Sequence, residues 1–265
     1  IILAPRGTGM HSCPARRQYN QNSMATECKS VRTGHVILCG MNEPLLDAIE
    51  INPPVPATAA IIWLHGLGAD GHDFAPLIPQ LGVVREMGVR VVLPHAPQMP
   101  VTVNGGMIMP AWYDILGTDF RQAQDAEGIR ASARRLEALI TRETERGIEP
   151  ARIILAGFSQ GGAIVLHTGL RHARRLGGIL ALSAYLPLGT QLAGEAAPAN
   201  RDVPVMMAHG SADPVVPLPL ADQSRELLET LGYRVEWHTY PMDHSVCPDE
   251  VADIRTWLHT VLQEG

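Results

Sequence analysis

The sequence predicts a single-domain α/β fold, with a mostly parallel sheet covered by helices on both faces. Short apolar segments recur along the chain, and longer segments with the periodicity of amphipathic helices fall between them. The segment 59–64 is continuously apolar and does not alternate with polar residues, which is typical of a parallel strand buried on both faces. We expect strands at residues 59–64, 89–93, 153–156, 179–183, 203–208 and 235–240.

Two helices are predicted together with the sides that they bury. Residues 125–146 carry Ile129, Ala133, Leu136 and Ile140 on one side, opposite a strongly charged side. Pro248 should open the last helix, because proline fits the first helical turn, where a backbone N–H has no partner. The buried side of that last helix is expected to carry Val251, Ile254, Trp257, Leu258 and Val261.

The length of 265 residues suits one sizeable core and does not require two domains. Residues 1–40 show no helical or strand periodicity, so we expect a flexible N-terminal extension there. The folded domain is then expected to span residues 41–265. Only about twenty residues separate the expected strands at 179–183 and 203–208. We therefore expect no cap domain over the strand ends.

Charge and hydropathy exclude several classes of partner. The formal net charge is -6 at pH 7 and no basic cluster occurs, so we expect no nucleic acid partner. No apolar run reaches the roughly 18 to 20 residues of a membrane span, and the first ten residues lack a signal-peptide core. A cytoplasmic protein without stable membrane insertion, acting on a small molecule, fits these patterns best.

Cysteine and glycine patterns indicate neither a cofactor nor a metal. Cys13, Cys28 and Cys39 lie in the first forty residues and Cys247 stands alone, so a disulfide framework is not expected. No Cys/His pair has zinc-finger spacing, and no glycine-rich loop has the phosphate-binding pattern with a following lysine. We expect chemistry without a metal ion or an organic cofactor.

The strand expected at 153–156 leads into a serine that has a glycine two residues before it and another two residues after it. Ser159 lies between Gly157 and Gly161, and a helical pattern follows. This arrangement is typical of a nucleophile elbow, a strained strand-to-helix turn in which only small residues fit beside the serine. The pattern alone is weak, but the apolar strand before it and the helix after it strengthen the prediction.

A serine hydroxyl needs a histidine to take its proton and a carboxylate to orient that histidine. In this fold class the order along the chain is serine, acid, histidine. Asp213 follows the strand expected at 203–208, and His244 follows the last strand. Asp202 precedes its strand and Asp249 belongs to the first turn of a helix, so both are weaker candidates for the acid.

Backbone N–H groups must stabilise the oxyanion that forms during acyl transfer. Gln160, directly after the serine, is expected to supply one donor, and Leu67 in the glycine-rich segment 65–71 a second. The alternative for that segment is an ordinary glycine-rich turn after a strand.

Read in order, six segments resemble the small bacterial carboxylesterases that are similar to acyl-protein thioesterases: HGLGADG, PVTVNGGMIMPAWYDI, GFSQGG, LSAYLP, HGSADPVVP and HSVCPDE. The resemblance extends from Met41 to about Leu262. It implies an α/β-hydrolase fold without a cofactor, the same Ser159, Asp213 and His244, and an oxyanion hole of Leu67 and Gln160.

The resemblance also implies that segment 100–115 lies beside an acyl pocket, with Trp112 near the substrate; a tryptophan that serves only the core is the alternative. Two features depart from the family pattern. Residues 1–40 have no recognised counterpart, and Asp243 precedes the histidine where a small or neutral residue is more usual.

We therefore expect a serine carboxylesterase that hydrolyses short- to medium-chain carboxylic esters through an acyl-serine intermediate. The alternative is an acyl-protein thioesterase, because both activities use the same side chains. A non-catalytic binding module of the same fold is disfavoured, since all the catalytic residue types are present. The oligomeric state stays open, a homodimer included.

Overall fold

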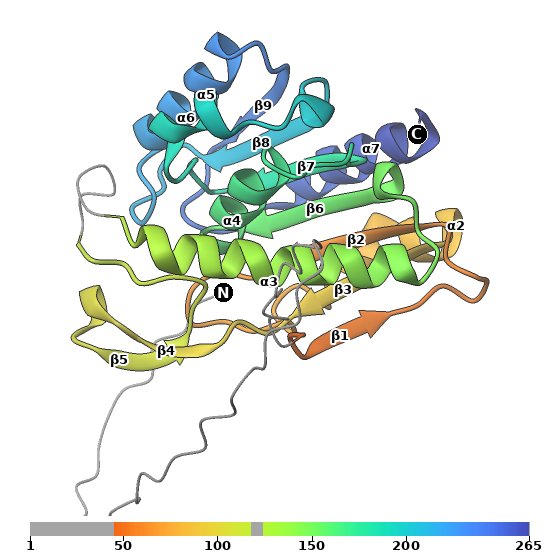
Figure 1. The fold of residues 1–265 in the computed structure, drawn as a ribbon, viewed down its shortest axis with the longest axis horizontal. Helices are drawn as coiled ribbons and strands as arrows, with labels where there is room; N and C mark the ends of the chain where they lie inside the picture. Colours follow the sequence, from red (N-terminus) through yellow and green to blue (C-terminus); the bar gives the residue numbers. More distant parts are fainter. Residues whose placement is uncertain (1–44, 118–123, 265) are drawn as a thin grey trace, which may run out of the picture. The chain divides into compact units, whose positions relative to one another are not determined.

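The computed structural model describes residues 45–117 and 124–264 of the chain, which belong to one compact unit. The predicted extension at 1–40 and its boundary at Met41 lie outside the described residues. The described part is an α/β domain built on a seven-stranded sheet (Figure 1). Its strands are β1 (Ala48–Ile51), β2 (Ala59–Leu64), β3 (Val89–Pro94), β6 (Ile153–Phe158), β7 (Gly178–Leu182), β8 (Val205–Gly210) and β9 (Val235–Tyr240).

The order of the strands across the sheet is β1-β3-β2-β6-β7-β8-β9. All neighbouring pairs are parallel except β1 and β3, so the mostly parallel sheet is confirmed. The six expected strands are all present, with ends shifted by one or two residues in four of them. Strand β1 was not predicted, because its four residues are only half-buried and lack a continuous apolar run.

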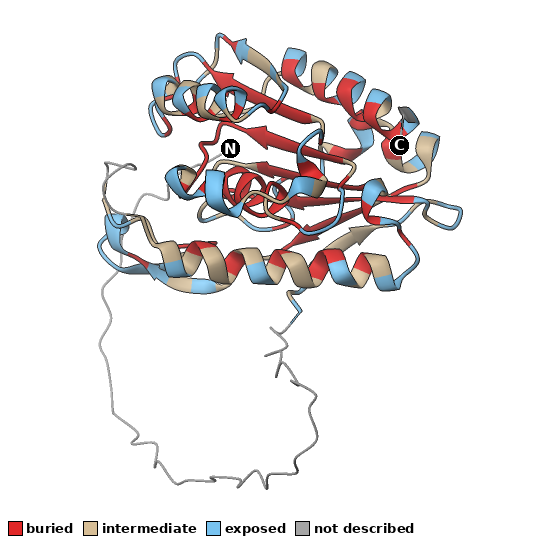
Figure 2. Ribbon diagram, turned by 45° about the horizontal axis from the view of Figure 1, so that its top comes forward, coloured by how far each residue is buried: buried red, intermediate tan, exposed pale blue. Residues whose placement is uncertain are grey.

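Helices cover both faces of the sheet. One face carries α1 (Ile78–Leu81), α2 (Val83–Met87) and α7 (Pro248–Glu264), whose buried residues pack in one apolar cluster. The other face carries α3 (Ala126–Glu145), α4 (Gln160–Gly169), α5 (Gly189–Glu195) and α6 (Leu218–Thr230), which share a second cluster. The central strands are almost wholly buried, whereas α3 is buried along its sheet-facing side (Figure 2).

The predicted helix faces need small corrections. In α3, Ala133 is only half-buried, and Ser132, Leu139 and Glu143 are buried instead. The side chain of Asp125 caps this helix by accepting a hydrogen bond from the Gly128 N–H. In α7, Val251 is half-buried, while Ile254, Trp257, Leu258 and Val261 are buried as expected.

A separate β-hairpin leaves the main sheet and forms the second sheet of the described chain. Strands β4 (Gln98–Val101) and β5 (Met107–Pro110) pair antiparallel, and the 3-10 turn η1 (Thr102–Asn104) lies between them. Gly105 and Gly106 both have positive φ, a conformation that glycine adopts without strain. Met107 and Ile108 are 63% and 68% exposed, so the hairpin presents apolar side chains to solvent.

The connection from β7 to β8 contains only α5 and the short turn η3 (Pro198–Asn200), in agreement with the expected lack of a cap domain. A further turn, η2 (Pro150–Arg152), leads into β6. Within residues 45–117 and 124–264, no helix combines the length and apolar composition that crossing a bilayer requires.

Candidate active site

Ser159 occupies the corner between the end of β6 and the start of α4. Its φ of 54° and ψ of -120° are unusual for a residue with a side chain. A Cβ on Gly157 would lie 2.4 Å from the Gly161 carbonyl carbon, and a Cβ on Gly161 would lie 2.4 Å from the Leu64 carbonyl oxygen. Both glycines are therefore required by close backbone contact, as the elbow pattern predicts.

The structure brings Ser159, Asp213 and His244 together, although they come from three different strand ends. Ser159 Oγ lies 2.9 Å from His244 Nε2, and Asp213 Oδ2 lies 2.6 Å from His244 Nδ1. A carboxylate can only accept, so Nδ1 carries the proton and Nε2 is free to accept the serine proton. This arrangement can activate the hydroxyl of Ser159 as a nucleophile.

The carboxylate of Asp213 is held on both of its oxygens. Oδ1 accepts hydrogen bonds from the N–H groups of Val215 and Val216, at 2.8 and 2.9 Å. Burial raises the pKa of Asp213, but the hydrogen bonds from His244 and from these backbone groups outweigh burial and hold the pKa below its ordinary value. Asp213 therefore stays ionised and can stabilise a protonated His244.

A second histidine, His209, lies beside the same carboxylate and was not singled out from the sequence. Its Nε2 donates to the Val216 carbonyl oxygen at 2.8 Å and lies 3.4 Å from Asp213 Oδ2. The side chain is fully buried, and burial lowers the pKa of His209, so the ring is neutral. Its place four residues before the acid, at the end of β8, is the only signal that the sequence carries.

The weaker acid candidates lie elsewhere. Asp202 is exposed and precedes β8, and Asp249 is exposed in the first turn of α7. Asp243, which departs from the family pattern, is exposed immediately before His244.

The two expected oxyanion donors lie on opposite sides of Ser159 in the chain. Gln160 is the first residue of α4, so its N–H has no acceptor within that helix. Leu67 lies in the turn after β2, where the Gly68 N–H donates to the Pro110 carbonyl oxygen at the end of the β4–β5 hairpin. The segment 65–71 is thus tied to the hairpin.

Trp112 is 2% exposed and lies in the core behind the turn after β2. Its Nε1 donates to the His65 carbonyl oxygen at 2.8 Å, and its backbone N–H donates to Gln160 Oε1 at 2.9 Å. These bonds link the two segments that carry Leu67 and Gln160. A direct contact between Trp112 and substrate stays a prediction. The burial of Trp112 favours a structural role, in which it holds these two segments together.

His65 holds the same turn from its other side. The Ala96 N–H donates to His65 Nε2 at 3.1 Å, so Nδ1 carries the ring proton and donates to the Gly66 carbonyl oxygen at 2.7 Å. Burial lowers the pKa of His65, which agrees with a neutral ring. The turn after β2 is thereby fixed against the segment that follows β3.

Comparison with known proteins gives one family and consistent relatives. A family model described as phospholipase/carboxylesterase matches residues 47–262. The acyl-protein thioesterase 1 of Gibberella zeae is 46% identical over 214 residues, which cover 77% of this chain and 91% of that protein. The acyl-protein thioesterase 1 of Yarrowia lipolytica is 38% identical over 226 residues, which cover 83% of this chain and all of that protein.

Solved structures agree with this fold. The crystal structure of Zea mays acyl-protein thioesterase 2 matches with a TM-score of 0.73 at 28% identity, covering 82% of this chain and 99% of that one. Arabidopsis thaliana SOBER1 has the same TM-score at 27% identity, covering 77% and 99%. The two curated relatives named above are fungal acyl-protein thioesterases, so they support the family implied by the sequence motifs but not the bacterial origin.

Proposed function

Because the chain belongs to the phospholipase/carboxylesterase family and is a serine hydrolase acting on ester bonds, we propose that it removes fatty acyl groups from protein thioesters. The observation that carries this proposal is the 46% identity to an acyl-protein thioesterase 1 over 91% of that relative. The comparisons thus favour the alternative drawn from the sequence over the expected short- to medium-chain carboxylesterase.

In the proposed mechanism, Ser159 is the nucleophile, His244 the general base and Asp213 the orienting acid. The Ser159 hydroxyl proton passes to His244 Nε2 as Oγ attacks the acyl carbonyl carbon. His244 returns that proton to the departing cysteine sulfur, which leaves as a free thiol. His244 then takes a proton from water as the water oxygen attacks the acyl-serine carbonyl carbon, and it returns that proton to Ser159 Oγ as the fatty acid leaves. The 2.9 Å and 2.6 Å contacts within the triad support these roles.

The backbone N–H groups of Leu67 and Gln160 are proposed to bind the oxyanion. Negative charge develops on the carbonyl oxygen in the tetrahedral intermediate, and donors fixed in advance stabilise it without reorganisation. The bonds of Trp112 and Gly68 described above support such rigidity.

The β4–β5 hairpin is proposed to hold the acyl chain. Its Met109 Sδ would lie 3.8 Å from a Cβ placed on Gly68, so the hairpin reaches the turn that carries Leu67. Exposed Met107 and Ile108 extend an apolar surface outward from that point. An open apolar surface suits a chain that is presented on a large protein, which could not enter a closed tunnel.

A comparison of two substrate types tests the proposal. The specificity constant kcat/KM is measured for a palmitoylated cysteine peptide and for a short aryl ester such as p-nitrophenyl butyrate. We expect the palmitoylated peptide to be the better substrate, and Ser159→Ala to lower both activities by about a thousandfold or more. Turnover of the aryl ester alone would favour the carboxylesterase, and retention of activity by Ser159→Ala would reject the assigned nucleophile.

We also propose a cytoplasmic location and a homodimer for this protein. A cytoplasmic location is tested by cell fractionation, and a homodimer by light scattering coupled to size-exclusion chromatography. The absence of a nucleic acid partner follows only from the net charge of -6 and stays a prediction.

A further inference from the structure

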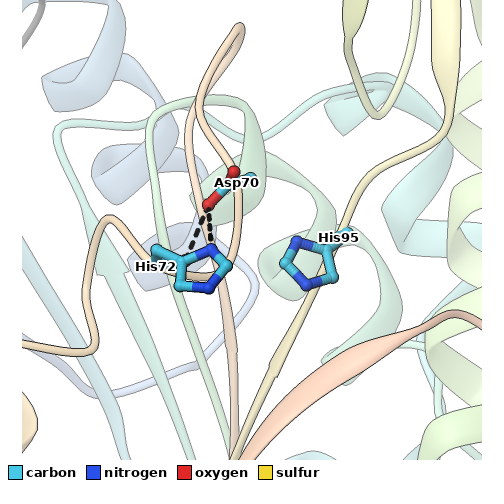
Figure 3. Close-up of side chains that lie close together, drawn as sticks. All are labelled: Asp70, His72 and His95. Atoms are coloured by element: carbon cyan, nitrogen blue, oxygen red, sulfur yellow. Dashed lines mark hydrogen bonds and ion pairs between the residues drawn. The ribbon is translucent and has the colours of Figure 1, made fainter.

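A cluster of possible metal ligands lies outside the proposed catalytic residues. Asp70 and His72 belong to the turn after β2, and His95 directly follows β3. Because β2 and β3 are parallel neighbours, both segments leave the sheet at the same edge. One ligand atom from each of the three side chains lies within 4.8 Å of the others (Figure 3).

Hydrogen bonds hold the three side chains near one another. Asp70 Oδ1 accepts from the His72 N–H at 2.8 Å and lies 2.9 Å from His72 Nδ1. The Gly71 N–H donates to His95 Nδ1 at 3.2 Å, and the two imidazole rings have centroids 5.6 Å apart. In Figure 3, the ring of His95 stands across from the Asp70–His72 pair.

The backbone around the cluster is tightly packed. A Cβ on Gly71 would lie 2.4 Å from the Leu93 carbonyl oxygen and 3.4 Å from His95 Cε1. The turn that carries Asp70 and His72 is therefore held directly against the end of β3. The side chains of Asp70 and His72 remain 50% and 74% exposed, so water and ions reach them.

We propose that Asp70, His72 and His95 form a binding site for a divalent transition ion of the Zn²⁺ type. Two imidazole nitrogens and one carboxylate oxygen are ligands that Zn²⁺ accepts, with water as a fourth ligand. Ca²⁺ and Mg²⁺ prefer oxygen ligands throughout and should bind poorly.

Forming the site needs side-chain rotation and the loss of the hydrogen bond from the Gly71 N–H to His95 Nδ1, because a metal ion needs a ring nitrogen with a free lone pair. Tetrahedral ligands at zinc distances lie about 3.3 Å from one another. The present separations of up to 4.8 Å can close by rotation of the exposed side chains, since the backbone already holds both segments together. The bound ion would take over the contact that His72 now makes with Asp70.

Such an ion would fasten the segment that carries Leu67 to the segment after β3. Leu67 lies three residues before Asp70. A bound ion would therefore restrict the motion of the turn that carries Leu67. The ion would not contact the catalytic triad and would take no part in the chemical step.

The test is titration of the full-length protein with Zn²⁺ by calorimetry in a non-chelating buffer at neutral pH. His72→Ala removes the most exposed ligand at little risk to the fold. His238→Ala is the matched control, because His238 also contacts carboxylates, those of Glu236 and Asp253, but has no second histidine in that group. Since Cys13, Cys28 and Cys39 can also bind Zn²⁺, the variants are compared with the parent and total stoichiometry is not used.

Beside any binding by cysteines, we expect a micromolar class of sites in the parent and in His238→Ala. This class should be lost, or its affinity should fall by about tenfold or more, in His72→Ala. Zn²⁺ should also protect His72 and His95 from diethylpyrocarbonate, as read by mass spectrometry, and leave His238 reactive. Ca²⁺ should give neither effect. The proposal is overturned if His72→Ala binds Zn²⁺ as the parent does, if both variants lose affinity equally, or if Zn²⁺ protects no histidine of the cluster.

Discussion

His209 Nε2 and Asp213 Oδ2 lie 3.4 Å apart, and neither side chain has any exposed surface. The same Asp213 oxygen is 2.6 Å from His244 Nδ1. One carboxylate oxygen therefore faces two imidazole rings, of which only His244 reaches Ser159. We take His209 to be a positioning residue, because it also holds the Val216 carbonyl group beside Asp213.

Replacing His209 by Phe should shift the acidic limb of the pH dependence of kcat/KM to higher pH. Without the His209 N–H, more of the Asp213 charge acts on His244, so a proton on His244 becomes more favourable and the base is lost at a higher pH. We expect a shift of about half a pH unit, with kcat lowered severalfold. His238→Gln, on the neighbouring strand, is the control. A lower kcat with an unmoved limb would indicate a structural role alone.

Glu250 should make the stability of the protein depend on pH. Its side chain is fully buried in the first turn of α7, and burial raises its pKa from 4.5 to about 8. The folded state then binds this proton more tightly than the unfolded chain does. The stabilisation is complete below about pH 4.5 and is lost as the pH rises through about 8.

The variant Glu250→Gln should remove this dependence. Between pH 5 and 8.5, the free energy of unfolding of the parent should fall relative to the variant by a few kcal/mol, with about 5 kcal/mol as the upper limit. Urea unfolding at several pH values measures this difference, and Glu127→Gln, on an exposed carboxylate, is the control. Parallel curves for parent and Glu250→Gln would show that the carboxylate is ionised in the folded protein.

Gly161→Ala should prevent formation of the elbow. Its Cβ would lie 2.4 Å from the Leu64 carbonyl oxygen, and backbone at that position cannot move aside without displacing β2. We expect loss of labelling by a fluorophosphonate probe and a lower melting temperature. Gly194→Ala in α5 is the control, because nothing lies within 4 Å of its added Cβ. It should keep full labelling and gain up to about 1 kcal/mol of stability.

Ile108→Ser should weaken hydrolysis of long acyl chains and leave acetyl esters unchanged. Each buried methylene contributes about 0.8 kcal/mol, so kcat/KM should fall about fourfold for each methylene that loses its contact. An acyl series from acetyl to palmitoyl, measured with the parent and the variant, shows where the two diverge. Val55→Ser, an exposed apolar residue in the loop before β2, is the control. Equal activities along the whole series would remove the hairpin from the acyl site.

Much of the fold could be predicted because burial on both faces leaves a simple mark in the sequence. Strand β2 was predicted with its observed ends because its six residues are all apolar and all buried. Strand β9 was also predicted with its observed ends, because β-branched and aromatic residues recur among polar ones from Val235 to Tyr240. Strand β1 and the β4–β5 hairpin were missed. Residues 98–101 contain a proline, and most residues of the hairpin are exposed, so neither apolar periodicity nor strand composition distinguishes it from a loop.

The candidate site was predictable where chain order carries the information. Ser159, Asp213 and His244 each follow a strand, and parallel strands bring their carboxyl ends to one edge of the sheet. His209 and Glu250 could not be recognised in this way. Both side chains are buried and have polar atoms without a hydrogen-bond partner. Residues distant in sequence bury them, so no periodic pattern in the sequence marks them.

The β4–β5 hairpin pairs with itself and with no strand of the seven-stranded sheet in the described chain. The elbow glycines, by contrast, tolerate no added atom. Substitutions should therefore be tolerated very unevenly. The residues around the elbow should vary little between relatives, whereas the tip of the hairpin should vary widely. In directed evolution, a library restricted to residues 102–109 would sample new substrate preferences while the chemistry stays intact.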